Sequence, residues 1–392
     1  MEFEDQKNYV KIRLFSELID GIRFTDNQRK LVNDLIFEMS ELNSTLTSLT
    51  TGDYKIFLLP LLMIEGESSS LIEGTKTRID DFAYDIVEMN NIPQWETRNL
   101  INLYHKYFNG DYYNKNFIFS ADSIANIHLE LYANDSNKKF KMTYDTSKEI
   151  SRVKPGKIMK DDADPNFIAG TTADIRDASI IMVKPSRKRE YLDDLMETIH
   201  DKYEKDSLLI EHIALMHPLF EAIHPFVDGN GRVGRLFLSL SLKFLYKQLN
   251  FPIYLSEFFN NNEKKYKQIL RDVQLNDNYD SWNEWISFFI DSLITSKRKM
   301  SDRVKDIIKL WKQIEDSNSI NTTIRKEIAK IFFKYYKIKK YFAMEKLKID
   351  HKGVSIQTLY NDWNIVTKAL NIKDNGDGYY VFSNLYKIIR QS

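Results

Sequence analysis

The chain has 392 residues and a mass of 46.4 kDa, and 43% of its residues are hydrophobic. This is enough for a large core and, at ~100–200 residues per domain, for two or three domains. Its 56 Lys and Arg balance 56 Asp and Glu, which argues against a protein whose whole surface binds polyanions. The sequence has no cysteine, which excludes disulfides, a thiol nucleophile and Cys-ligated metal sites.

The opening Met-Glu-Phe-Glu-Asp is acidic, unlike the start of a signal peptide. The longest apolar run, 56–64, is far shorter than the roughly 20 residues that a membrane-spanning helix needs. We therefore expect a cytoplasmic protein without membrane contact.

Low contents of Gly and Pro, 13 and 8, predict a mostly α-helical chain. In the N-terminal part, Thr25 or Asp26 should cap a helix. The residues expected on one face of this helix are Leu31, Leu35, Met39 and Leu42. A second stripe at helical spacing consists of Trp282, Trp285, Phe289 and Leu293. We expect both stripes to be buried, because an amphipathic helix packs its apolar face against the core.

The segment near residue 70 has the pattern of a helix end. Ser69 and Glu73 are four residues apart and share a helix face, and Gly74 is a natural stop. The order Gly-Thr-Lys-Thr at 74–77 differs from the Gly-Lys-Ser/Thr of a P-loop. From these facts alone, a capped surface helix is the simplest interpretation.

The helical period fails between residues 144 and 185, where Pro and Gly recur. The run Ile-Ile-Met-Val at 180–183 is typical of a short strand. We predict a loop and a β-hairpin inserted into a helical body.

The segment with the most chemistry is Ile-His-Pro-Phe-Val-Asp-Gly-Asn-Gly-Arg-Val-Gly-Arg at 223–235. It should lie between a helix over about 207–223 and another over about 232–249, since apolar residues recur at helical spacing in both. The start of a helix presents unpaired N–H groups and a partial positive charge, which suit phosphate. Gly229 and Gly231 would allow positive φ and a close approach to a ligand.

The side chains of this loop also suit nucleotide chemistry. Arg232 and Arg235, three residues apart, can bind phosphate oxygens from one helix face. Asp228 offers the hard oxygen that Mg²⁺ prefers, and His224 is a natural proton acceptor near neutral pH. A plain turn would explain any one of these residues. Their co-occurrence within twelve residues favours a site that binds phosphate and moves a proton.

The tail beyond residue 320 differs in charge and pattern. After a polar linker at 315–319, residues 321–392 hold 14 Lys and Arg against 6 Asp and Glu, a net of +8. Helical patterns over 342–349 and 355–370 flank a turn at 352–353, and the turn residues of 374–378 lead into an apolar strand pattern. Helix, turn, helix and hairpin are the outline of a winged helix.

The segment 224–235 resembles the signature of the Fic (filamentation induced by cAMP) family, His-Pro-Phe-x-Asp/Glu-Gly-Asn-Gly-Arg-x-x-Arg, at every fixed position. The resemblance implies an all-α Fic fold with a small inserted β-hairpin. It divides the chain into an N-terminal helical region at 1–95, a catalytic core at 96–300 and a C-terminal winged-helix domain at 320–392.

The resemblance also implies an activity, the Mg²⁺-dependent transfer of AMP from ATP to a Tyr, Thr or Ser hydroxyl of a protein. His224 would take the proton and Asp228 would hold the metal. The implied nucleotide-binding set is Gly229, Asn230, Gly231, Arg232, Val233, Gly234 and Arg235, with Tyr266 either beside the adenine or in the core. The target is unknown, and self-modification and a homodimer are compatible with the resemblance.

The same resemblance implies a function for the helix end near residue 70. Ser69, Glu73 and Gly74 fit the Ser/Thr-x-x-x-Glu-Gly/Asn pattern of the inhibitory helix of Fic relatives. Glu73 would then pair with Arg235, because a carboxylate competes with the γ-phosphate for the same guanidinium. This predicts an autoinhibited enzyme.

Two alternatives stay open. Related death-on-curing toxins are kinases with Lys at the position of Gly231 and without the last arginine, so Gly231 and Arg235 disfavour kinase activity here. Other relatives transfer phosphocholine or UMP, or remove AMP, with almost the same motif. Alternatively, the basic tail could make the chain a DNA-binding regulator. In its candidate reading helix only Lys368 is basic, so base readout is not supported.

Overall fold

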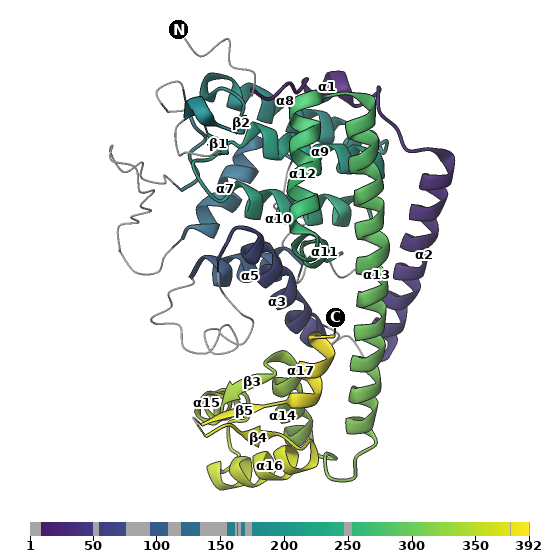
Figure 1. Ribbon diagram of the computed structural model, residues 1–392. Coiled ribbons are helices and arrows are strands. Elements are labelled where there is room, and N and C mark those ends of the chain that lie inside the picture. Colours follow the sequence, from purple (N-terminus) through teal and green to yellow (C-terminus); the bar gives the residue numbers. More distant parts are fainter. Residues whose placement is uncertain are drawn as a thin grey trace. The chain divides into compact units, whose positions relative to one another are not determined.

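The computed structural model describes residues 9–49, 55–75, 95–108, 119–133, 155–160, 163, 166–168, 175–246, 253–376 and 378–391 (Figure 1). They are mostly helical with a few short strands, which confirms the predicted helical class. The chain divides into two compact units. The first consists of residues Met1–Ile36 and Asn102–Ile294, and the second of residues Phe37–Ile101 and Thr295–Ser392.

The first unit is built around α9 (Ile210–Ile223), a helix in which every residue is buried. A helix buried on every face needs packing partners on all sides. It packs against α8 (Pro185–Glu204), α10 (Asn230–Leu245) and α12 (Glu263–Asn276). Among the described residues, the other helices that lie wholly in this unit are α1 (Phe15–Leu18), α7 (Ala121–Leu131), α11 (Ser256–Asn261) and the short 3-10 helix Ile175–Asp177.

The predicted hairpin is present in the first unit. Strand β1 (Phe167–Ile168) pairs antiparallel with β2 (Ile180–Ile181), within the apolar run that predicted a strand. The strands are only two residues long, and parts of the predicted loop lie outside the described residues.

The second unit holds α3 (Lys55–Ile72) and the C-terminal elements. In chain order the latter are α14 (Thr323–Lys334), β3 (Lys337–Lys339), α15 (Lys340–Asp350), α16 (Ile356–Ala369), β4 (Lys373–Asp374), β5 (Tyr379–Val381) and α17 (Ser383–Ile389). The three strands form an antiparallel sheet in the order β3-β5-β4. Helix α3 packs against α14 and α17, so the tail shares a core with an N-terminal helix.

Three helices, α2 (Asp26–Leu49), α5 (Trp95–Phe108) and α13 (Tyr279–Glu315), each contain a boundary between the units. Thr25 begins α2 as predicted, because its hydroxyl accepts from the Gln28 N–H while its own N–H donates to the Gln28 side chain. All four residues of the Trp282 stripe are fully buried, as predicted.

The predicted stripe of α2 is partly wrong. Leu35 and Met39 are buried, but Leu31 is 45% exposed. Val32 and Ile36 are buried instead, so the buried face is turned by one residue from the predicted one.

In the part of the chain that the structure describes, none of the helices combines the length and the apolar composition needed to span a membrane.

Candidate active site

The loop between α9 and α10 carries the predicted site residues. Helix α9 ends at Ile223 and α10 begins at Asn230, two residues earlier than predicted. Gly229 precedes α10 with φ of 80°. The first N–H groups of α10 therefore face the loop without helical partners. The prediction for Gly231 was wrong: this residue lies in the first turn of α10 and has no positive φ, because the helix has already begun.

His224 occupies an unusual backbone conformation at the end of α9. Its φ of 49° and ψ of 61° are left-handed, a region that costs a residue with a side chain roughly 1–3 kcal/mol. Its Nδ1 lies 3.1 Å from the Glu221 carbonyl oxygen. A carbonyl oxygen can only accept, so Nδ1 carries the proton and Nε2 carries the lone pair. His224 is thus held in the tautomer of a proton acceptor.

Every carbonyl from residue 220 to residue 228 accepts a hydrogen bond. This is unusual for a loop, because the last carbonyls of a helix lack helical partners. His224 donates from its N–H to carbonyl 220 and from Nδ1 to carbonyl 221, and the Val183 N–H donates to carbonyl 222. Lys188 Nζ donates to carbonyls 223 and 224. The donors to carbonyls 225, 226, 227 and 228 are, in that order, Met159 N, Asn230 Nδ2, Asn166 Nδ2 and His128 Nε2. We call residues 220–228 with these donors the braced loop. The Asn230 side chain makes two hydrogen bonds to the backbone of Phe226: its Oδ1 accepts from the N–H and its Nδ2 donates to the carbonyl.

His128 of α7 supports the loop, although no motif in the sequence surrounds it. Its Nδ1 accepts from the Gly156 N–H at 2.8 Å, so its Nε2 donates to the Asp228 carbonyl at 3.0 Å. The ring stacks on Phe226 at a centroid distance of 3.9 Å. Burial lowers the pKa of His128 to about 4, although its hydrogen bond to Asp228 acts in the opposite direction. His128 is therefore a neutral support for the loop at physiological pH.

This buried histidine predicts a pH dependence of stability. Its folded-state pKa of about 4 lies below the usual 6.5, so the unfolded chain binds the extra proton first as pH falls. The stabilisation is complete above about pH 6.5 and is lost towards pH 4, by up to about 3 kcal/mol for His128 alone. We expect the free energy of unfolding to fall between pH 6.5 and 5, where carboxylates are still ionised. Urea denaturation of the wild type and His128→Gln checks this; equal slopes against pH would contradict it.

Asp228 and Arg232 are linked through Tyr132 of α7. The Tyr132 hydroxyl donates to Asp228 Oδ2 at 2.7 Å and accepts from Arg232 Nη2 at 3.1 Å. Arg232 Nη2 is also 3.5 Å from Asp228 Oδ2. The Arg232 side chain is 4% exposed and that of Asp228 is 17% exposed, so the carboxylate is the more accessible of the two. Tyr132 thus orients both charged groups.

Gly229 needs to be glycine for two reasons. Its φ of 80° strains any residue with a side chain, and a Cβ would lie 2.7 Å from Tyr132 Cε2. We expect Gly229→Ala to lower the free energy of unfolding by about 2–3 kcal/mol, from backbone strain and displacement of Tyr132. Gly378→Ala is the matched control in urea denaturation, since its φ is 76° but nothing lies within 4 Å of its Cβ. Equal losses in the two variants would show that the contact with Tyr132 does not matter.

The rest of the motif lies in the body of α10. Arg235 is 2% exposed, and Val233 is fully buried. Gly234 faces α9, because a Cβ there would lie 2.7 Å from Glu221 Oε1 and 2.8 Å from Phe220 Cδ1. Close packing of the two helices therefore accounts for this glycine.

Tyr266 lies in an aromatic core and is 2% exposed. Its ring stacks on Phe259 at 4.6 Å, and its hydroxyl is 2.8 Å from His217 Nε2. Burial, and secondarily the charge of Arg235, lowers the pKa of His217 to about 3. Packing accounts for the position of Tyr266, and a contact with the adenine stays a prediction.

The predicted inhibitory segment lies at the end of α3. Ser69 is fully buried in the last turn, and Glu73 is an exposed residue just after it. Gly74, with φ of 79°, stops the helix as predicted. Its N–H donates to the Leu71 carbonyl, and the Thr75 N–H donates to the Ser70 carbonyl, which is the Schellman arrangement. Glu73 is therefore held at a defined helix end.

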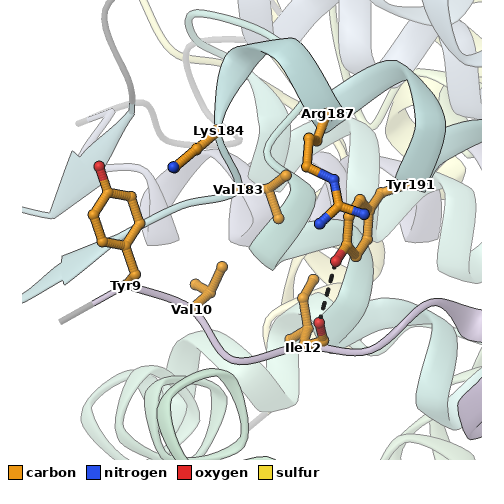
Figure 2. A pocket seen from close by; sticks show the side chains of 7 residues that line it. All are labelled: Tyr9, Val10, Ile12, Val183, Lys184, Arg187 and Tyr191. Carbon is orange, nitrogen blue, oxygen red and sulfur yellow. Dashed lines mark hydrogen bonds between the residues drawn. The ribbon is translucent and has the colours of Figure 1, made fainter. Parts of the chain in front are cut away.

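The hairpin is paired on both edges of β2. Tyr9 bridges Ile181 in parallel, and the Val10 N–H donates to the Ile181 carbonyl at 2.9 Å. A cavity of about 390 Å³ beside this segment is lined by Tyr9, Val10, Ile12, Val183, Lys184, Arg187 and Tyr191 (Figure 2). Of these residues only Val183 belongs to the braced loop, as the donor to the Ala222 carbonyl, and none lies in α10. Described residues thus occupy both sides of β2, so a further strand could not pair with β2 itself.

At Asp228 a metal ion would need a bound phosphate ligand in addition to the protein's own side chains. The described residues contain no cluster of three or more His, Asp or Glu that could hold one alone. Asp228 offers a single, partly exposed carboxylate. Mg²⁺ is commonly bound through one or two carboxylates together with substrate phosphates and waters, so Asp228 fits that pattern.

Residues 119–242 match the Fic/DOC family. This range contains the braced loop and its outside donors from His128 to Lys188. Among solved structures, a Fic family protein from Desulfovibrio desulfuricans G20 is similar, with 15% identity and a TM-score of 0.51 over 92% of this chain and 97% of that chain. At this identity the likeness concerns the fold alone.

Two other structures match with lower scores. One is a Fic domain containing signaling protein from Bacteroides thetaiotaomicron VPI-5482, with 15% identity and a TM-score of 0.49 over 69% of this chain and 97% of that chain. The other is Fic-1 from C. elegans, with 17% identity and a TM-score of 0.44 over 75% of each chain.

Proposed function

We propose that this chain, which carries a Fic/DOC family domain at residues 119–242, is a protein adenylyltransferase. Proteins with such domains typically transfer nucleotides or other groups onto proteins. The observation that carries the proposal is the state of His224, in the loop that leads to α10. Its Nδ1 donates a hydrogen bond to the Glu221 carbonyl, so Nε2 is the proton-accepting nitrogen. The donor would be ATP and the acceptor a hydroxyl side chain of a protein.

The proposed reaction is one displacement at phosphorus. His224 Nε2 takes the proton of the target hydroxyl while its oxygen attacks the α-phosphorus of ATP. The bond from that phosphorus to the oxygen leading to the β-phosphate breaks, and pyrophosphate leaves. Such transfer needs mainly positioning and neutralisation of charge, and the braced loop supplies the positioning.

The remaining motif residues would bind the triphosphate. The N–H groups of the first turn of α10 suit an anion, and Arg232 and Arg235 follow within the first two turns. Asp228 would hold Mg²⁺, which when bound would offset the charge of the phosphates. Tyr132 keeps the Asp228 carboxylate and the Arg232 guanidinium oriented for these roles.

The proposal includes a brake at the end of α3. Glu73 would pair with Arg235 and occupy the guanidinium that the γ-phosphate needs, as the pattern of residues 69–74 suggests by resemblance. The hydrogen bonds at the end of α3 support this role, because they fix the backbone next to Glu73 and so hold its carboxylate at a defined position.

We also propose that residues 323–389 form a winged helix. The order helix, strand, helix, helix, strand, strand and the sheet order β3-β5-β4 support this assignment. A crystal structure in which β3 pairs with a strand other than β5 would contradict it.

Labelled ATP tests the reaction directly. The full chain is incubated with Mg²⁺ and ATP labelled at either the α- or the γ-phosphate, with and without a cell extract as a source of targets. Protein-bound label from the α-position alone is the expected result. Label from the γ-position would make the protein a kinase, and no label from either would contradict the proposed transfer.

A further inference from the structure

Lys188 is a lysine buried completely in the first unit. It lies in the first turn of α8, and its side chain is fully shielded from solvent. Lysine is almost never buried in this way unless it is paired, because losing the hydration of the ammonium is costly. Burial lowers the pKa of Lys188 to about 7. A side chain kept in so unfavourable a place needs strong local partners.

Those partners are two successive carbonyls of the braced loop. Lys188 Nζ donates to the Ile223 carbonyl at 2.7 Å and to the His224 carbonyl at 2.8 Å. The first carbonyl belongs to the peptide plane before the Cα of His224, and the second to the plane after it. Since the two planes define φ and ψ of His224, one ammonium constrains both angles.

The constrained angles are the left-handed pair, 49° and 61°. A residue other than glycine leaves this region unless its surroundings hold it there. These angles set the direction of the Cα–Cβ bond, and with it the positions that the imidazole can reach. The bond of Nδ1 to the Glu221 carbonyl at 3.1 Å therefore depends on the same constraint.

We infer that Lys188 is a positioning residue for the proposed transfer: it holds the backbone of His224 so that Nε2 points at the substrate hydroxyl. This role rests on the proposed function, in which His224 is the base. Lys188 does not touch the substrate in this scheme. It also offsets the partial negative charge at the end of α9, where the Ile223 carbonyl is the last of the helix.

Lys188→Met removes both hydrogen bonds while keeping the length of the side chain. Misplacement of a catalytic group by about 1 Å can lower a rate ~100-fold, so we expect kcat to fall about 100-fold and KM for ATP to stay unchanged. Lys205→Met, at the other end of α8, is the matched control, since Lys205 is exposed and pairs with Asp201. It should keep the wild-type kcat.

Lys188→Arg keeps N–H donors at the same position and should retain more of the wild-type kcat than Lys188→Met. A folded Arg variant as slow as the Met variant would overturn the inference. If Lys188→Met does not fold, the Arg variant is compared with the wild type by the same measurements, and loss of the rate in a folded Arg variant counts against the inference.

Histidine NMR tests the inference without any activity. The seven histidines are labelled with ¹³C in the ring, and the signal of His224 is the one absent from His224→Ala. In Lys188→Met this signal should shift or broaden, while the signal of His217 in the core of α9 stays in place. A His224 signal unchanged in a folded Lys188→Met variant would overturn the inference. If the wild type transfers no AMP, the proposed function fails, and the NMR result still decides the role of Lys188.

Discussion

His224→Ala should lower AMP transfer by about 10²–10⁴-fold, the range that a positioned general base contributes. The reason is the tautomer: Nδ1 is committed to the Glu221 carbonyl, and Nε2 is the ring nitrogen that can accept the proton of the attacking hydroxyl. Alanine removes this acceptor and leaves the phosphate-binding residues of α10 in place. Binding of ATP should therefore persist, and initial rates with α-labelled ATP together with a titration of nucleotide binding measure the two effects separately.

Two further variants separate the base from the backbone. His224→Asn removes the base but tolerates the left-handed angles, since Asn is enriched in that region; it should be as slow as the Ala variant. His200→Ala, on α8 and outside the braced loop, should keep the wild-type rate. If either His224 variant kept more than about a tenth of the rate, the assigned base would be wrong, because the expected loss starts near 10²-fold.

Glu73→Gly should raise AMP transfer by roughly 10- to 100-fold. Hydrogen bonds to charged groups contribute about 1.5–3 kcal/mol, and removal of the carboxylate would release Arg235 for the γ-phosphate. The measurement is the initial rate of α-label transfer by the full chain at a fixed ATP concentration. Glu73→Gly combined with His224→Ala should fall to background, which would place the gain in the same active site.

Glu73→Gln separates the charge of this residue from its position at the helix end. Glutamine keeps the size but cannot form an ion pair, so it should also activate the enzyme. Activation by Gly but not by Gln would mean that the helix end matters rather than the carboxylate. Wild-type rates in both variants would rule out inhibition by Glu73 without contradicting the proposed AMP transfer.

The sequence indicates the candidate site because the relevant residue types are local. A base, a carboxylate, two arginines and the start of a helix lie within residues 224–235, so their proximity follows from chain geometry. Gly231 was misjudged because the start of α10 was placed two residues too late. A shift of that size changes whether a glycine belongs to a loop or to a helix.

The supports of the loop could not be predicted in the same way. His128 and Lys188 reach the loop over separations of 100 and 36 residues, and no local pattern sets them apart from other histidines and lysines. Lys188 even belongs to a polar, charged stretch, Arg-Lys-Arg-Glu, that is typical of an exposed helix. Only packing reveals that one of these four side chains is buried.

Periodicity succeeded for helices whose burial is one-sided and regular. The Trp282 stripe and two helices of the tail, α15 and α16, were found for this reason. It failed at Leu31, where two adjacent faces of α2 carry apolar residues and the sequence does not say which one packs. It also missed β3, since its polar-apolar-polar alternation spans only three residues of a lysine-rich run, too few to indicate a strand.

The order of synthesis determines when the braced loop can form. Its outside donors, at positions 128, 159, 166, 183 and 188, all precede the loop in the chain. Because synthesis proceeds from the N-terminus, the motif leaves the ribosome after the groups that will hold it. A chain that ends before residue 224 therefore contains these donors but not the histidine. Under the proposed chemistry, nucleotide transfer begins only after the groups that position the base have been made.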